Sequence, residues 1–148
     1  SEPGKAHLNR ASYRPDSWSD IIQGLVLLKG RYIIGTLSNG NISLIVNMAK
    51  HSGLPWDVVL GAEVAGHYKP CPKAYLESAK KLDLAPHQCL LVAAHNTDLH
   101  AASGCGFRTA FVARPMEYGP DQKTDLSADY DCDVIATDFV DLAEQLQA

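Results

Sequence analysis

The chain has 148 residues, of which 46% are hydrophobic and 20% are charged, which is typical of one soluble domain and excludes a disordered or collagen-like chain. No run approaches the roughly 20 apolar residues that cross a bilayer, and the first twenty residues lack the apolar segment of a signal peptide, so we expect a cytoplasmic protein with no membrane contact. The net charge of -4 argues against binding to nucleic acid and favours a small-molecule partner. The cysteines are widely spaced and form no C-x-x-C pattern, so we expect four free thiols at Cys71, Cys89, Cys105 and Cys132.

Short apolar runs alternate with amphipathic segments along the chain. The apolar runs predict strands at residues 32–37, 58–60, 89–93, 109–112 and 133–136. Helical spacing appears between and around them, at residues 18–28, 41–53, 72–82 and 138–146. The runs do not alternate with polar residues, so we expect strands that are covered on both faces in a parallel α/β sheet. Residues 1–15 and 114–131 show no clear period and are interpreted as connections or tails.

The loop that follows the first predicted strand carries Ser38, Asn39 and Gly40. In a parallel sheet, the loops at the carboxyl ends of the strands lie along one edge, where ligands bind. A hydroxyl, an amide and a glycine backbone at the start of a helix can hold a carboxylate or a phosphate. Taken alone, however, the same residues are better explained as a helix cap and a tight turn.

A second loop holds Lys69 beside Pro70 and Pro72, ahead of Tyr75 on the next predicted helix. The prolines fix the backbone, and a lysine on rigid backbone can stabilise an anion as a point charge. The alternative is a surface lysine next to a helix that begins with proline. Only in combination with the first loop does the anion site become the better interpretation.

A third loop runs from the strand at residues 89–93 into a helix and carries His95 and Asp98. Asp98 would lie in the first helical turn, where a carboxylate also serves as a structural cap. The pair could suggest metal ligands, but two ligands do not make a site. His100 lies five residues from His95, off the shared helical face. We therefore predict no metal.

Taken together in this order and spacing, Ser38-Asn39-Gly40, Lys69-Pro70 with Tyr75, and Asp98 at a helix start resemble the second, third and fourth motifs of the haloacid dehalogenase superfamily. More narrowly they resemble the type II 2-haloacid dehalogenases, from about residue 16 to the C-terminus. The resemblance implies a three-layer, Rossmann-like core domain over residues 16–148. It also implies hydrolysis of short 2-haloacids, in which an aspartate displaces halide from Cα and an activated water then cleaves the resulting ester.

The resemblance also implies a role for each matching residue. Ser38 and Asn39 would hold the substrate carboxylate, and Tyr75 would support that site. Lys69 would balance the negative charge of the nucleophile and the substrate. Asp98 would orient or activate the hydrolytic water, with His95 close by. The reaction needs no cofactor.

The third loop departs from the family pattern and also separates the two main activities of the superfamily. The chain has Ala93 where a serine is common in the dehalogenases and His95 where an asparagine is common. The related phosphatases use a Gly-Asp pair where this chain has Ala93 and Ala94, and that aspartate helps to bind magnesium. A methyl group in place of a hard carboxylate ligand favours dehalogenation.

The first motif of the family, Asp-x-x-Gly-Thr, does not occur in this sequence. The Gly-Thr pair at Gly35 and Thr36 has Tyr32 at the aspartate position. The resemblance therefore implies the C-terminal two thirds of an enzyme, in which residues 1–15 are a remnant of the helical cap or a linker. The central first strand would be absent, leaving unpaired edges that an N-terminal segment, another copy of the chain or closure of the two halves would cover.

Two alternatives to a dehalogenase remain open. One is a metal-dependent phosphatase of the same superfamily. The other is a non-catalytic, truncated module, which the missing nucleophile favours for this chain taken alone. We accordingly expect the chain by itself to release no halide.

Overall fold

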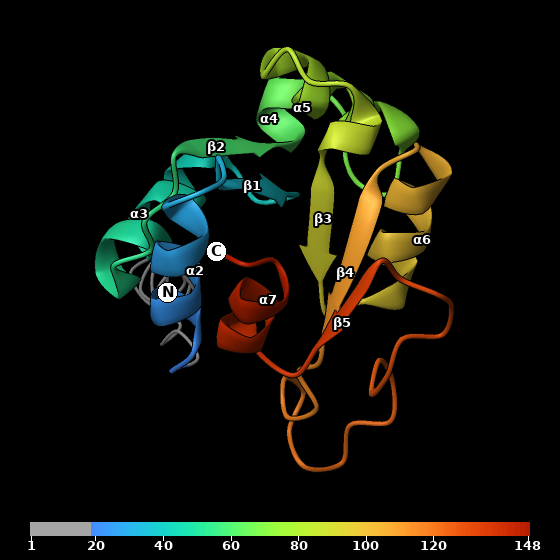
Figure 1. Ribbon diagram of the computed structural model, residues 1–148. Helices are drawn as coiled ribbons and strands as arrows, with labels where there is room; N and C mark the ends of the chain where they lie inside the picture. Colours follow the sequence, from blue (N-terminus) through green and yellow to red (C-terminus); the bar gives the residue numbers. More distant parts are fainter. Residues whose placement is uncertain (1–18) are drawn as a thin grey trace, which may run out of the picture.

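The computed structural model describes residues 19–148. Helices and strands alternate along the chain (Figure 1), in the following order: α2 (Ile21–Lys29), β1 (Gly35–Ser38), α3 (Ile42–Ser52), β2 (Val58–Gly61), α4 (Ala62–Ala65), α5 (Pro72–Lys81), the 3-10 helix η1 (Pro86–Gln88), β3 (Leu90–Ala93), α6 (Asn96–Gly104), β4 (Arg108–Val112), β5 (Val134–Ala136) and α7 (Phe139–Gln145). All five predicted strands form. The proposed remnant at residues 1–15 lies outside the described residues.

The strands form two separate parallel sheets. β1 pairs with β2, from Gly35 opposite Val58 to Ser38 opposite Gly61. The second sheet has the order β3-β4-β5. In Figure 1, β1 and β2 lie across the direction of β3 and β4. Within residues 19–148, β1 and β3 are not hydrogen-bonded to each other, so the two halves do not close and each of these strands keeps one unpaired edge.

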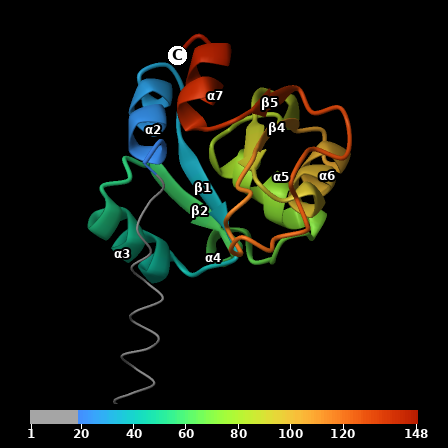
Figure 2. The same cartoon turned by 90° about the horizontal axis from the view of Figure 1, so that it is seen from below.

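Three layers meet at β4, whose side chains alternate between two apolar clusters. Ala110 and Val112 pack with α2, α7 and β5. Phe111, on the opposite face, packs with α5, α6 and β3. Figure 2 shows the same division, with α2 and α7 on one side and α5 and α6 on the other. The predicted three-layer α/β arrangement is therefore confirmed.

The expectation that every strand is covered on both faces is wrong for β5, where Ile135 is 57% exposed, and most clearly for β1. This strand begins at Gly35 rather than at residue 32, and none of its residues is fully buried. Ile33, just before it, is 65% exposed. β4, by contrast, has four of its five residues buried. β4 has a strand neighbour on each side and helices on both faces, whereas β1 has only β2.

The helices predicted over residues 41–53 and 138–146 begin and end at residues that satisfy their free backbone groups. The side chain of Asn41 accepts a hydrogen bond from the backbone N–H of Leu44 at 2.8 Å and begins α3, and Gly53 ends it in the left-handed region at φ 69°. Asp138 begins α7 in the same way, by accepting from the N–H of Asp141. The short elements α4 and η1 were not predicted, because so few residues show no hydrophobic period.

Asp20 joins segments that lie far apart in the sequence. Its carboxylate accepts hydrogen bonds from Nη1 and Nη2 of Arg114, at 3.0 and 2.7 Å, and from the N–H of Phe139 at 2.8 Å. Burial raises the pKa of this carboxyl group, but the hydrogen bonds from Arg114 and Phe139 outweigh burial and hold the pKa below its usual value. The contact links the start of α2, the end of β4 and the start of α7.

Two further expectations are tested by the described part of the chain. All four cysteines are free thiols. None of the helices in residues 19–148 is long and apolar enough to cross a membrane.

Candidate active site

The first polar loop starts where β1 ends, and a glycine on β2 makes room for it. Ser38 lies opposite Gly61, whose φ is 149°. A Cβ atom at Gly61 would lie 2.1 Å from the carbonyl oxygen of Ser38. Only glycine allows the two strand ends to come this close.

The amide of Asn39 holds the second loop in place. Its Oδ1 accepts a hydrogen bond from the backbone N–H of Lys69 at 2.7 Å, and its Nδ2 donates to the carbonyl of Lys69 at 3.1 Å. The two bonds join the end of β1 to the loop before α5. Asn39 thus fixes the backbone from which the Lys69 side chain extends.

Lys69, Asp98 and Tyr75 form one connected cluster. Nζ of Lys69 pairs with Oδ2 of Asp98, and the two side chains are only 20% and 15% exposed. The hydroxyl of Tyr75, a fully buried residue, donates to Oδ1 of Asp98 at 2.5 Å. Burial, together with the neighbouring Asp98 carboxylate, raises the pKa of Tyr75 far above its usual value, so the phenol remains a hydrogen-bond donor.

This cluster faces an open pocket of about 540 Å³. Five of the six residues predicted from the sequence line it: Asn39, Lys69, Tyr75, His95 and Asp98. Ser38 is not among the residues that line the pocket. Its hydroxyl oxygen accepts a hydrogen bond from the N–H of Gly40 at 3.0 Å, which stabilises the turn after β1.

His95 meets two residues that the sequence analysis did not select. Its Nε2 lies 2.8 Å from Oε2 of Glu117 and 3.1 Å from the hydroxyl of Tyr118. The rings of His95 and Tyr118 are stacked, with centroids 6.1 Å apart. Both partners, Glu117 and Tyr118, belong to the segment at residues 114–131. This segment has no hydrophobic periodicity and no recognisable motif that would have singled them out.

The described residues offer little to a hard metal ion. Within residues 19–148, no group of three His, Cys, Asp or Glu side chains could hold one. Both oxygens of Asp98 already have partners, in Tyr75 and Lys69. Ala94, next to the end of β3, has no ligand atom in its side chain.

We expect magnesium not to bind to this chain. A magnesium ion keeps several waters and needs one or two carboxylates with substrate phosphate, and binding at Asp98 would have to displace the Lys69 ammonium. Calorimetric titration with magnesium chloride should give no heat beyond dilution. Saturable heat that disappears in Asp98→Asn would contradict this prediction.

Parallel strands β1 and β3 lead into Asn39 and Asp98, and the loop of Lys69 is bound to Asn39. With helices on both faces of β4, this arrangement matches the Rossmann-like fold of the haloacid dehalogenase superfamily. Within that superfamily, the neighbours point to the L-2-haloacid dehalogenases, and the chain matches their C-terminal part. No family model matches the chain.

Two solved structures and one curated protein carry this comparison. The L-2-haloacid dehalogenase PA0810 is 50% identical, with a TM-score of 0.90 over 91% of this chain and 58% of its own. The defluorinating L-2-haloacid dehalogenase Rha0230 is 49% identical, with a TM-score of 0.93 over 96% of this chain and 58% of its own. (S)-2-haloacid dehalogenase 1 from Pseudomonas sp. (strain CBS-3) is 27% identical over an alignment of 120 residues that covers 77% of this chain and 53% of that protein. The chain therefore spans a little over half the length of these relatives.

Proposed function

We propose that this chain carries part of the active site of a 2-haloacid dehalogenase, a hydrolase that cleaves the carbon–halogen bond of a short 2-haloacid. The observation that carries the proposal is the cluster of Lys69, Asp98 and Tyr75 on an open pocket at the strand ends. The two solved structures at 49% and 50% identity, both named as L-2-haloacid dehalogenases, support the proposal. The four free thiols agree with a cytoplasmic site for the reaction.

In this proposal, Lys69 attracts the substrate carboxylate. Its ammonium group has three donors, of which the pair with Asp98 uses one. Asn39 holds the Lys69 backbone and has a remaining amide donor for the same carboxylate. The Ser38 hydroxyl can still donate its hydrogen to the substrate carboxylate, although its oxygen already accepts a hydrogen bond from the N–H of Gly40. Tyr75 keeps Asp98 oriented.

The reaction itself needs a nucleophilic carboxylate, which the proposal draws from an added strand. That carboxylate would form a C–O bond at Cα while the carbon–halogen bond breaks and halide leaves. Water would then cleave the ester, releasing a 2-hydroxyacid and restoring the carboxylate. Asp98 would accept a hydrogen bond from this water through the lone pairs that Lys69 and Tyr75 leave free, with His95 nearby.

We further propose that an N-terminal segment supplies this strand between β1 and β3. Both strands have an unpaired edge, and a parallel strand between them would end beside Lys69 and Asp98. A strand from a second copy of the chain is the competing way to cover these edges, although that copy also lacks the Asp-x-x-Gly-Thr motif. The oligomeric state of the active protein distinguishes the two, since only the second requires a dimer.

A small carboxylate should stabilise the folded chain, because a ligand that binds only the folded state raises the melting temperature. We expect 2-hydroxypropionate, at about 100 times its Kd, to raise the melting temperature by roughly 5 to 10 °C. Differential scanning fluorimetry measures the shift. Propionamide, which has the same size but no charge, is the control and should have no effect.

The same assay separates a dehalogenase from a phosphatase. Inorganic phosphate with magnesium should stabilise the chain no more than phosphate alone. Stabilisation that appears only when phosphate and magnesium are present together would contradict the dehalogenase proposal and favour phosphoryl transfer.

A further inference from the structure

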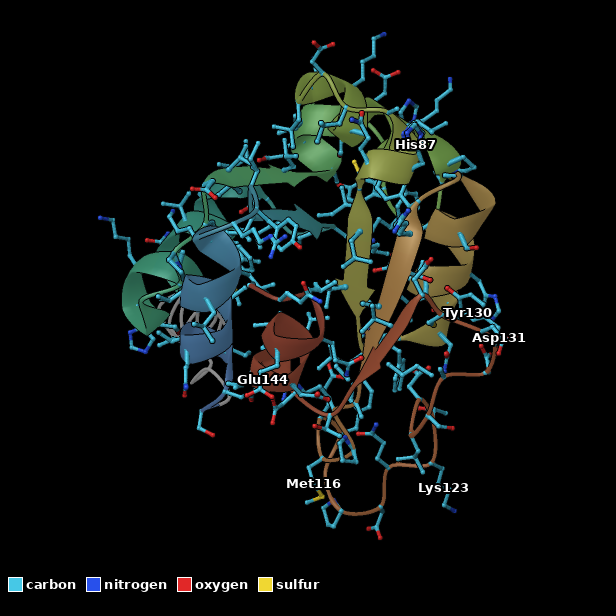
Figure 3. The ribbon with its side chains drawn as sticks, viewed as in Figure 1. His87, Met116, Lys123, Tyr130, Asp131 and Glu144 are labelled. Atoms are coloured by element: carbon cyan, nitrogen blue, oxygen red, sulfur yellow. The ribbon has the colours of Figure 1, made fainter. Side chains whose placement is uncertain are left out.

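The segment between β4 and β5 has no helix or strand, yet it forms one wall of the pocket. Tyr118, Thr124 and Asp125 from this segment line the pocket together with Lys69. In Figure 3, Met116 and Lys123 lie at its outer end, far from the sheet. A segment this irregular must be held to the rest of the protein by side chains if it is to form a wall.

Asn96 is the residue that holds it. Its backbone N–H and its Nδ2 both donate to Oδ1 of Asp125, at 2.9 and 3.0 Å. Nδ2 also donates to the carbonyl of Ser127 at 2.9 Å, and Oδ1 accepts from the N–H of Asp129 at 3.1 Å. Asn96 is 8% exposed, so these bonds are partly shielded from water, although their partners lie nearer the surface.

Asp125 also replaces a missing helix cap. His95, at the N-cap position of α6, makes no capping hydrogen bond through its side chain. Asp125, which lies 29 residues after Asn96, accepts from the first N–H of the helix in its place. The His95 ring can therefore point to Glu117 and Tyr118 instead of to its own helix.

We propose that Asp125 is a positioning residue that holds residues 114–131 against the pocket and thereby sets Glu117 and Tyr118 on His95. This inference rests on the proposed function only in the choice of ligand for the pocket. The hydrogen bonds themselves are independent of any ligand. Loss of the Asp125 hydrogen bonds would release this segment and widen the pocket on the side that the segment lines.

Cleavage by trypsin after Lys123 reports the state of the wall. Lys123 lies in the segment itself, two residues before Asp125, so cleavage there requires local opening (Figure 3). Asp125→Ala removes the acceptor, and Asp125→Gly does so without strain, because the φ of 55° at this position suits glycine. Asp125→Asn keeps an acceptor oxygen. Asp129→Ala is the matched control. It removes an exposed ion pair with His100 but keeps the backbone N–H that donates to Oδ1 of Asn96.

We expect Asp125→Ala and Asp125→Gly to be cleaved after Lys123 about tenfold faster than the wild-type chain, which corresponds to loss of one or two buried hydrogen bonds. Asp125→Asn and Asp129→Ala should be cleaved at close to the wild-type rate. In a calorimetric titration with 2-hydroxypropionate, the affinity should fall several-fold in the first two variants only. Circular dichroism spectra identical to that of the wild-type chain would show that the variants are folded.

Equal cleavage rates in Asp125→Gly and Asp129→Ala would overturn the proposal. Equal rates in Asp125→Asn and Asp125→Ala would also overturn it, since the acceptor oxygen would then have no effect. Failure of the wild-type chain to bind 2-hydroxypropionate would count against the proposed function alone, because the cleavage assay contains no ligand and decides the role of Asp125 by itself.

Discussion

Replacement of Lys69 by methionine is expected to reduce the affinity of the chain for 2-hydroxypropionate by at least about 100-fold, the usual cost of truncating one partner in a buried charged contact. Methionine keeps the length of the side chain but removes the ammonium group. Asp98 would then keep Tyr75 as a partner and lose its cation. Its uncompensated negative charge would repel the carboxylate ligand. The melting-temperature shift caused by the ligand should disappear.

Lys73→Met is the matched control for this result. Lys73 is exposed in the first turn of α5 and does not line the pocket. Its replacement removes the same charge from the same region of the chain, so any effect of net charge alone would appear in both variants. If Lys69→Met and Lys73→Met kept the same ligand-induced shift, Lys69 would not belong to the carboxylate site.

The second large effect is expected on stability, from the Asp20–Arg114 pair. The two side chains are only 15% and 12% exposed. In Arg114→Ala, the Asp20 carboxylate would keep its hydrogen bond from the N–H of Phe139 but lose its cation. Loss of one partner of a buried ion pair typically lowers the unfolding free energy by about 3 kcal/mol. Urea denaturation should show this loss of unfolding free energy. Lys29→Ala, which breaks an exposed pair with Asp57 and a hydrogen bond to the carbonyl of Pro55, should cost far less.

The pH dependence of stability follows from the lowered pKa of Asp20. A carboxyl group whose pKa is lower in the folded state contributes stability above its unfolded pKa, near 3.9, and loses it as the pH falls through the folded value. The wild-type chain should therefore lose part of its advantage over Arg114→Ala as the pH falls below about 4. An unchanged difference in unfolding free energy between pH 7 and pH 3 would contradict this assignment.

Local patterns predicted the elements of this fold because their causes are local. Hydrophobic period, a capping asparagine at residue 41 and a capping aspartate at residue 138 act within a few residues, and the structure has helices that begin at both. The three polar loops were found for a similar reason. They follow predicted strands, and the carboxyl ends of parallel strands share one edge.

The parts that sequence reasoning missed depend on contacts between distant residues. Asp125 contacts Asn96 across 29 positions, and nothing in its own neighbourhood indicates a cap for another helix. The hydrogen bonds of the Asn39 amide to the backbone of Lys69, 30 residues away, were also not expected, whereas binding of the substrate carboxylate by Asn39 stays a prediction. The low burial of β1 also has a distant cause, because it depends on which strands lie beside it.

Chloride release from 2-chloropropionate tests the central claim most directly. The assay compares the chain alone with the chain mixed with a strand segment that ends in Asp-x-x-Gly-Thr, and binding of the segment is measured separately. The account predicts no release by the chain alone and sustained release by the mixture, which Lys69→Met should abolish. Sustained release by the chain alone, or no release by a mixture in which the segment is bound, would contradict it.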